Sequence, residues 1–220
     1  MKLTIPDLYD LDHTLAGDYL RQFTYPWEAL AGIGDMISAL GAELRPDEYD
    51  HPEEGVWVAR DAKVYPTAYL GAPCIIGHKT EVRPGAFIRG NALVGDNCVV
   101  GNSTELKNVI LFDNVQVPHY NYVGDSILGY KSHMGAGSIT SNVKSDKLPV
   151  VIHNEGEEIE TGRKKVGAML GDYVEVGCNS VLNPGTVIGR DASVYPTSCV
   201  RGVVPERCIY KAKGNIAVKK

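Results

Sequence analysis

The sequence contains few large aromatic side chains. Among 220 residues there are three Phe and two Trp, against 24 Gly and 12 Pro. A chain of this length can bury a substantial core. Residues other than bulky aromatics must therefore fill the interior, and the arrangement of the aliphatic and small residues becomes the main source of information about the fold.

Long apolar runs and an excess of positive charge are also missing. The longest uncharged apolar stretch, around Val109–Phe112, is far too short to span a bilayer, and the first seven residues lack the apolar segment of a secretory signal. The formal net charge is −5. Because phosphate-binding surfaces are basic, this charge argues against nucleic acid as the main partner. We expect a cytoplasmic protein that contacts neither nucleic acid nor a membrane.

The cysteines form no CxxC pair, and their number is odd. We interpret them as small buried residues of a protein from a reducing compartment. They are Cys74, Cys98, Cys178, Cys199 and Cys208.

An aliphatic residue returns at every sixth position from Val58 to Leu106, and the same spacing reappears from Leu170 to Val200. Neither the helix period of 3.6 nor the strand period of 2 produces this pattern. It is explained if six residues form one short strand and one corner, so that three hexads close an 18-residue coil around a column of aliphatics. The pattern predicts an all-β fold, a left-handed parallel β-helix of hexapeptide repeats, which is an exception to right-handed crossovers.

The hexad frame slips by one residue at two places, between Leu106 and Leu111 and between Val123 and Leu128. An irregular coil can redirect side chains toward a site. A harmless local irregularity is the alternative interpretation, and the spacing alone leaves both open.

Residues 1–54 do not follow the repeat. Apolar spacing near 16–23 and 27–44 is helix-like, and residues 46–54 are acidic and contain proline. We interpret this region as a short helical cap or lead-in that protects the open end of the β-helix, with residues 46–54 as a linker into the first coil.

The predicted β-helix domain, residues 55–210, is interrupted at 143–165, where ten of 23 residues are charged. Apolar residues on both sides of Asn154-Glu155-Gly156 predict a projecting β-hairpin. The hairpin is interpreted either as a carrier of binding groups or as a solvated protrusion. Residues 211–220 form a basic C-terminal tail.

Several side chains with useful chemistry gather near the two slips of the frame. Arg83 and His119 are expected on one wall, Lys107 on the next, Tyr122 at the corner that joins the two, and His133 near the preceding corner. Together they would suit an anionic substrate that must lose a proton. Taken singly, each is as well explained as a solvated surface residue.

A series of short motifs follows in fixed order along the chain. These motifs are Tyr25-Pro-Trp-Glu28, Arg83-Pro-Gly85, Glu105-Leu-Lys107, Pro118–Asp125, Gly135–Asn142, Thr161-Gly-Arg-Lys-Lys165 and Asn183-Pro-Gly185. Over about residues 58–205 the chain thereby resembles the acetyltransferase domain of bifunctional sugar-1-phosphate acetyltransferase/uridylyltransferases, especially the archaeal type. The glycine-rich nucleotide-binding signature of the uridylyltransferase half is absent, so we do not expect that activity.

The resemblance implies a role for each matching residue. It implies His119 as the general base, and as sugar-phosphate contacts it implies Arg83, Lys107, Tyr122, His133 and Asn142. Contacts to the coenzyme are expected from Ala136, Gly137, Cys178 and, through its charge, Lys213. Three residues depart from the family pattern: His133 replaces an asparagine, Val143 a tyrosine and Cys178 a serine. These departures bear on which sugar is the substrate more than on the type of reaction. The family forms trimers with sites between subunits, so the hairpin could reach the site of a neighbouring subunit.

The reaction we expect is transfer of an acetyl group from acetyl-CoA to the amine of a hexosamine 1-phosphate, with no metal required. An imidazole can take the amine proton at neutral pH. Arg83 and Lys107 would hold the phosphate, and backbone N–H groups of Gly135-Ala136-Gly137 would stabilise the oxyanion. Lys213 would pair with coenzyme phosphates, unless the tail is simply solvated.

Three other functions stay open on the sequence. The first is O-acetylation of another acceptor. The second is a subunit without catalytic activity that binds sugar nucleotides or a protein partner. The third is a zinc carbonic anhydrase, which needs three closely placed histidines; none of the six histidines has that spacing.

Overall fold

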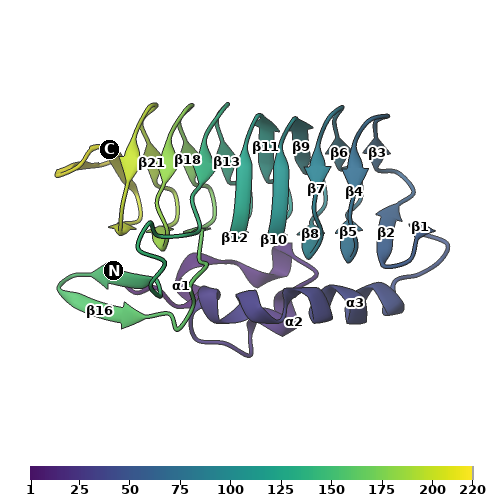
Figure 1. Ribbon diagram of the computed structural model, residues 1–220, viewed down its shortest axis with the longest axis horizontal. Helices are drawn as coiled ribbons and strands as arrows, with labels where there is room; N and C mark the ends of the chain where they lie inside the picture. The colour runs from purple at the N-terminus through teal and green to yellow at the C-terminus, as the bar shows by residue number, and fades with distance from the viewer. Residues whose placement is uncertain (220) are drawn as a thin grey trace.

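The structure is a computed structural model that describes residues 1–219. Short strands stack into a long column, and helices lie along one side of it (Figure 1). Val64 pairs in parallel with Val82, and Val82 pairs with Val100. Successive coils are therefore 18 residues apart, as the hexads predict. The predicted left-handed parallel β-helix of hexapeptide repeats is confirmed.

The column has three faces. The first face contains β3 (Lys63–Val64), β6 (Glu81–Val82), β9 (Val99–Asn102), β11 (Gln116–His119), β13 (His133–Met134), β18 (Glu175–Val176), β21 (Ser193–Val194), β24 (Cys208–Ala212) and β25 (Asn215–Val218). The second face contains β4 (Tyr69–Leu70), β7 (Phe87–Ile88), the first halves of β10 (Glu105–Leu111) and β12 (Tyr122–Leu128), β14 (Ile139–Thr140), β19 (Val181–Leu182) and β22 (Cys199–Val200). The third face contains β1 (Tyr49–Glu53), β2 (Val56–Ala59), β5 (Cys74–Ile76), β8 (Ala92–Val94), the second halves of β10 and β12, β17 (Ala168–Leu170), β20 (Thr186–Ile188) and β23 (Val203–Val204).

The interior of the column is built from the hexad aliphatics. Val82, Leu106 and Leu111 are fully buried, and apolar burial of this kind is the main stabilising term for the fold. The corners turn at residues with positive φ, such as Asn108 at +56° and Asn114 at +62°. Asparagine tolerates this left-handed conformation better than most residues.

The two slips of the hexad frame lie at one corner of the column. β10 and β12 each run through the corner between the second and third faces, and the turn is made within the strand by Asn108 and by Asp125, whose φ is +48°. Leu106 pairs with Val123, so this coil has 17 residues instead of 18. Each slip is therefore a corner with one residue fewer than usual. The missing residue changes which side chains lie at the corner between the second and third faces.

The helical segment lies along the third face and not over the open end of the column (Figure 1). The expectation that it caps this end is therefore wrong. The segment consists of α1 (Ile5–Leu8), η1 (Leu11–His13), α2 (Gly17–Leu20), η2 (Pro26–Ala31) and α3 (Ile33–Glu43), with η1 and η2 as 3₁₀ helices. From β5 to β20 the outward residues of this face are apolar and fully buried, and their burial holds the helices against the side of the column. These residues are Ile75, Leu93, Ile110, Ile127, Met169 and Val187. The open end keeps Val58, Val64 and Leu70 half-exposed.

Two other regions are more ordered than the sequence predicts. Part of the presumed acidic linker is β1, which pairs antiparallel with β2. The C-terminal tail begins inside β24, which forms a hairpin with β25. The last residue of the predicted tail lies outside the described residues.

The insertion forms the predicted hairpin, with β15 (Val151–Asn154) antiparallel to β16 (Glu157–Glu160). Its turn residues Glu155 and Gly156 both have positive φ, as a two-residue hairpin turn requires. Within residues 1–219, no helix has the length and apolar character needed to cross a membrane.

The cysteines are free thiols, but only part of the expectation for them is confirmed. Cys74, Cys98 and Cys208 are buried as expected, whereas Cys178 and Cys199 are exposed. The exposed pair lies on outward positions of the coils, where no second layer covers them.

Candidate functional site

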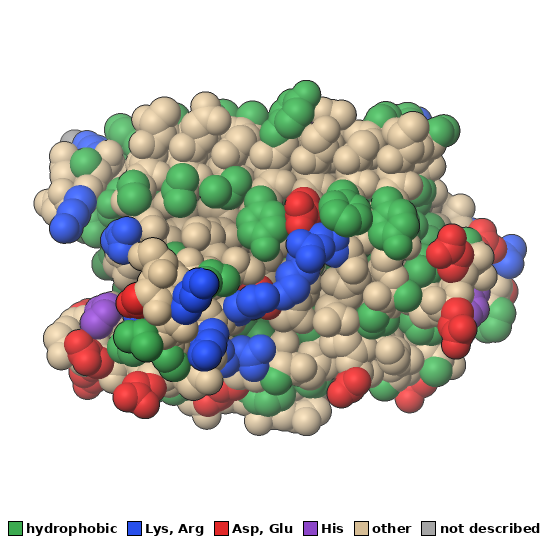
Figure 2. All heavy atoms as spheres, in the orientation of Figure 1, with side chains coloured by type: hydrophobic (Ala, Val, Ile, Leu, Met, Phe, Trp, Pro, Cys, Tyr) green, Lys and Arg blue, Asp and Glu red, His purple; other side chains and the backbone are tan. Residues whose placement is uncertain are grey.

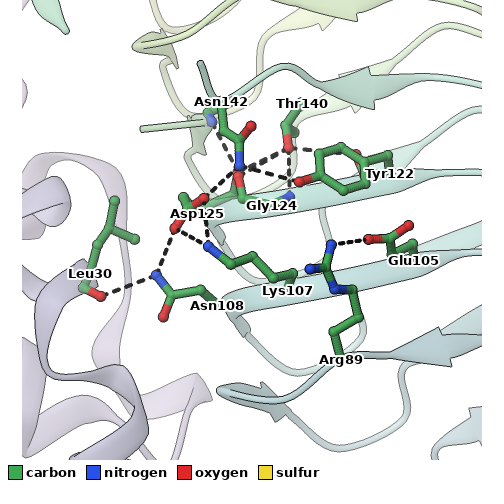
Figure 3. Close-up of polar contacts among 12 residues, drawn as sticks. Leu30, Arg89, Glu105, Lys107, Asn108, Tyr122, Gly124, Asp125, Thr140 and Asn142 are labelled. Atoms are coloured by element: carbon green, nitrogen blue, oxygen red, sulfur yellow. Dashed lines mark hydrogen bonds and ion pairs between the residues drawn. The ribbon is translucent and has the colours of Figure 1, made fainter. Parts of the chain in front are cut away.

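The predicted site residues separate into groups at different edges of the column. Lys107 and Asn142 meet at the corner between the second and third faces, with Tyr122 beside them (Figure 3). His119 lies at the corner between the first and second faces. A single chain therefore carries two clusters instead of one.

Asp125 is the centre of the first cluster (Figure 3). Its side chain is only 3% exposed. Its carboxylate accepts hydrogen bonds from Lys107 Nζ at 3.0 and 3.1 Å, from Asn108 Nδ2 at 3.0 Å and from Asn142 Nδ2 at 2.5 Å. A buried carboxylate needs such partners, and in return it holds their side chains in fixed positions. The ammonium and the amide at this corner are thus preorganised.

Tyr122 extends this network along the second face. Asn142 Nδ2 donates to the Tyr122 hydroxyl oxygen at 3.2 Å. Burial, and after it the negative charge of Asp125, raises the pKa of Tyr122 above its usual value of 10.0. The phenol therefore stays protonated at neutral pH and can donate its hydrogen to a bound acceptor.

An open groove of about 500 Å³ borders the Asp125 cluster. Lys107, Asn108 and Asp125 line it from the β-helix, together with Asn91. The end of η2, Leu30 and Ala31, lines it from the helical segment, and residues 162–165 line it from the insertion. Three separate parts of the chain thus build one groove.

The groove is strongly cationic. Arg163, Lys164 and Lys165 line it, and none of them forms an ion pair with another residue in 1–219. Lys107 is balanced by Asp125 at 3.0 Å, whereas Arg163, Lys164 and Lys165 remain uncompensated. Figure 2 shows Lys and Arg side chains gathered across the middle of the molecule. The groove will attract an anionic group such as a phosphate.

Sequence reasoning missed several members of this groove. The motif containing Arg163, Lys164 and Lys165 was used only for the resemblance, although three consecutive basic residues are themselves a signal. Asp125 and Asn108 were also missed. Their signal was the slip of the frame, since each lies within a shortened hexad.

His119 belongs to a ladder of corner residues. The Gly137 N–H donates to the His119 carbonyl at 3.0 Å, and the Asn179 N–H donates to the Ala136 carbonyl at 2.8 Å. Thr197 N–H donates in the same way to the Cys178 carbonyl, at 2.8 Å. His119, Ala136 and Cys178 therefore stack on successive coils, about 4.8 Å apart. The His119 side chain is exposed, and its imidazole has no hydrogen-bond partner among the described residues.

At residues 135–137, where an oxyanion site is expected, fewer backbone N–H groups are free than the prediction assumes. Two of the three glycine-loop amides are already engaged, because Gly135 N–H donates to the Val176 carbonyl at 2.7 Å and Gly137 N–H to the carbonyl of His119. Within residues 1–219, the Ala136 N–H has no acceptor. Only this amide is open to an oxyanion.

Arg83 and His133 lie apart from Lys107, on the first face. Arg83 pairs with Glu81 at 3.2 Å, and His133 Nδ1 lies 2.8 Å from a Glu175 carboxylate oxygen. Both side chains are partly exposed. One chain alone does not bring these two predicted substrate contacts to the basic groove.

Lys213 lies in the turn between β24 and β25, at the C-terminal end of the column. Val194 pairs with Tyr210, so Pro196 and Ala212 are in register. Lys213 therefore follows the corner column that begins at His119.

The zinc alternative finds no support in one chain. Within residues 1–219, no group of three or more His, Cys, Asp and Glu side chains is placed to hold a metal ion. The histidines have other neighbours: His13 stacks on Tyr130, and His78 lies 2.9 Å from Asp61.

These features define the protein class as a hexapeptide-repeat β-helix with a basic groove at one corner. A family model described as the GMPPB C-terminal domain matches residues 70–188. This is more than half of the chain, and the chain belongs to that family.

Curated relatives extend this relationship. The bifunctional sugar-1-phosphate nucleotidylyltransferase/acetyltransferase of Sulfurisphaera tokodaii is 32% identical over 145 residues, which is 66% of this chain and 36% of the relative. The bifunctional protein GlmU of Methanococcus maripaludis is 31% identical over 208 residues, 92% of this chain and 50% of the relative. The chain thus spans between about a third and a half of these relatives. The family resemblance predicted from the motifs is confirmed.

Among solved structures, the crystal structure of the polySia-specific acetyltransferase NeuO has a TM-score of 0.42 and is 16% identical. The match covers 70% of this chain and 72% of that chain.

Proposed function

We propose that the chain is an acetyl-CoA-dependent N-acetyltransferase that acts on a hexosamine 1-phosphate. The observation that carries this proposal is the basic groove, which three uncompensated cations line together with Lys107. Asp125 holds Lys107 in place and also binds Asn142. The relative from Sulfurisphaera tokodaii, which is named as a bifunctional sugar-1-phosphate nucleotidylyltransferase/acetyltransferase, supports a sugar 1-phosphate as the substrate.

His119 is the proposed general base. The amine of the acceptor attacks the thioester carbonyl carbon while the His119 imidazole takes its proton, because imidazole groups titrate near neutral pH. The tetrahedral intermediate then breaks the C–S bond, and the departing thiolate takes the proton from the imidazolium. The Ala136 N–H is the proposed oxyanion donor, since it is open and lies one coil from His119.

The coenzyme is proposed to lie along the corner column that runs from His119 to Lys213. Four coil steps separate these ends, a length of roughly 20 Å at one strand spacing per coil. The residues between them include the small Ala136 and the exposed Cys178, which leave the corner shallow. Lys213 at the far end would meet the coenzyme phosphates.

We further propose that the active form is a homotrimer with sites between subunits. The outward row of the second face is open and mostly apolar, with Tyr69 58% and Phe87 42% exposed. Glu105, which is paired with Arg89 at 2.8 Å, is the charged member of this row. Ile139 and Val181 continue this row and are half-exposed. Packing this row against a second copy would bury the apolar surface. It would also allow Arg83 and His133 of one copy to approach the Lys107 groove of another.

The direct test is release of free thiol from acetyl-CoA in the presence of amino-sugar acceptors. We expect release with glucosamine 1-phosphate or galactosamine 1-phosphate, and much weaker release with the unphosphorylated sugars. A matched N-acetylated sugar 1-phosphate, which has no free amine, should give none.

The alternatives predict other outcomes in the same assay. Equal release with the N-acetylated sugar would indicate O-acetylation. No release with any acceptor, combined with retained binding of a sugar nucleotide, would indicate a binding subunit and refute the proposed reaction.

A further inference from the structure

The helical segment is hydrogen-bonded to the wall of the basic groove by a side chain of the β-helix, Asn108. This residue is only 7% exposed and has a φ of +56°. Its Nδ2 donates to the Leu30 carbonyl at 3.1 Å and to Asp125 Oδ1 at 3.0 Å (Figure 3). Both amide hydrogens are therefore used, one on each side of the groove.

The Leu30 carbonyl needs this partner because of its place in the helical segment. Leu30 lies at the end of η2, where its carbonyl receives no hydrogen bond from a backbone N–H of the described residues. The preceding carbonyl, of Ala29, accepts from the Tyr19 hydroxyl at 2.6 Å. Two side chains thus bind the end of η2: Tyr19 binds the Ala29 carbonyl, and Asn108 binds the Leu30 carbonyl from the side of the groove.

A second contact packs the junction between η2 and α3 against the neighbouring coil. A Cβ added at Gly34, at the start of α3, would lie 2.6 Å from Asn91 Oδ1. Asn91 also lines the groove. The junction between η2 and α3 therefore fits closely against two successive corners, so its position and that of Leu30 and Ala31 are set together.

On the other side, Asn108 is one of the three donors that orient Asp125. The same Asp125 Oδ1 accepts from Lys107 Nζ at 3.0 Å, and Oδ2 accepts from Asn142. Without Asn108, the carboxylate would lose a donor and could turn toward Lys107. The ammonium would then be held in a different place relative to an incoming phosphate.

We propose that Asn108 is a positioning residue that makes the helical segment a working part of the acceptor site. By joining the Leu30 carbonyl to Asp125, it fixes one wall of the groove and the placement of Lys107 and Asn142 at the same time. Its consequence is selectivity for the phosphorylated acceptor, because only that acceptor uses the preorganised ammonium. This inference rests on the proposed acetyltransferase function.

The test compares Asn108→Gly with Asn97→Gly. Glycine accepts the positive φ at both positions, so neither change strains the backbone. Asn97 has a φ of +54°, is exposed and makes no side-chain hydrogen bond within residues 1–219. For each variant, kcat and KM are measured with a hexosamine 1-phosphate, with the same hexosamine lacking phosphate, and with acetyl-CoA. Calorimetry with the hexosamine 1-phosphate measures binding without turnover.

We expect Asn108→Gly to lower kcat/KM for the phosphorylated acceptor about 10- to 100-fold, and to weaken its binding in parallel. Values for the unphosphorylated acceptor and the KM for acetyl-CoA should stay within about twofold, and Asn97→Gly should match the wild type. An Asn108→Gly enzyme that keeps its preference for the phosphate, or that loses both acceptors equally, would overturn the inference.

A measurement on the wild type covers the case of a poorly folded variant. Binding of the hexosamine 1-phosphate should slow hydrogen exchange at the η2–α3 junction, because ligand and junction share the Asn108–Asp125 contacts. Unchanged exchange on saturation would count against the inference. A wild type that neither binds nor acetylates the sugar phosphate would instead refute the proposed function, and the inference with it.

Discussion

Single residues at the corners of the column perform two tasks at once. Asn108 and Asp125 turn the chain with positive φ, and their side chains also build the groove. At other corners the same conformation has no such use, as at the exposed Asn97. The chemistry of the site is therefore placed at corners whose positive φ favours Asn or Asp over most other residues.

Replacing His119 by alanine tests the proposed base. Turnover should fall by about 10²- to 10⁴-fold, because proton removal from the amine loses its acceptor. The far-UV circular dichroism and the melting temperature should not change, since the His119 ring is exposed. His153→Ala, at an exposed hairpin position, is the control and should keep full turnover. An unaltered rate in His119→Ala would remove His119 from this role.

Asp113 makes stability depend on pH. Burial, and then the charge of Asp96, raises the pKa of Asp113 above its usual value of 3.8, although its Oδ1 accepts from the Asp96 N–H at 2.8 Å. The folded state thus binds this proton more tightly than the unfolded state. The stability from this group is present below pH 4 and is lost as the pH rises through the folded pKa.

Asp113→Asn keeps an oxygen acceptor but cannot ionise. The variant should gain stability relative to the wild type as the pH rises from about 4 to 7, in urea unfolding at several pH values. Asp35→Asn, at an exposed position of α3, should follow the wild-type curve. A constant difference between Asp113→Asn and the wild type would contradict the assignment.

At the scale of elements, the helical segment and the insertion form separate walls of the same groove. The helical segment covers an apolar face and brings Leu30 to Asn108. The insertion turns back after its hairpin, so that Arg163–Lys165 reach Lys107 of their own chain. The rigid column between them determines how far apart these two walls stand.

Removing the positive charges of Lys164 and Lys165 should weaken the binding of the phosphorylated acceptor only. In the double variant Lys164→Ala/Lys165→Ala, we expect the KM for a hexosamine 1-phosphate to rise about 10-fold or more, and its salt dependence to weaken. The KM for acetyl-CoA should not change. Lys144→Ala, in the same insertion but paired with Asp146, is the matched control. Equal losses with and without the phosphate would show that the charges serve the fold.

The helices that cover the third face should contribute measurably to the free energy of unfolding. Leu93 is outward on this face yet fully buried under the helices, so Leu93→Ala should lower the free energy of unfolding by about 2–5 kcal/mol, as for an interior leucine. Val99 is outward on the uncovered first face and half-exposed, and Val99→Ala should cost about 1 kcal/mol or less. Urea unfolding of both variants compares them. Similar costs would indicate that the helices contribute little to stability.

At the scale of the whole molecule, the two clusters of site residues lie on different edges of one column. Lys107 and Asn142 are at one corner, whereas His119 is at another and its ring has no partner within residues 1–219. A second copy packed on the open second face would bring complementary clusters together. The oligomer we propose is thus part of the site.

This proposal predicts a mass three times that of the chain by light scattering. Phe87→Glu and Ile139→Glu place a charge in the apolar row, and each should shift the mass toward that of a single chain and abolish turnover. Leu15→Glu, at an exposed apolar position of the helical segment, should leave mass and activity unchanged. Full activity in a monomeric variant would refute sites between subunits.

Much of the fold could be predicted because the hexads specify both a strand and a corner. The slips also marked the correct corner, since a shortened hexad has to turn at Asn108 or Asp125. A further signal was present but missed: on the third face the residue before each interior aliphatic is apolar too, as in Ile75-Ile76 and Leu93-Val94. This pattern predicts a covering layer along the side of the column.

The local period of the chain therefore determined the coil, its core and the corners, because each hexad is shaped by neighbouring residues. Only the tertiary structure decided which corner becomes a groove. The contact between Leu30 and Asn108 spans 78 residues, and the meeting of Lys107 with Arg163–Lys165 depends on where a hairpin returns to the column. Such contacts arise from packing across coils, which the order of the residues does not display.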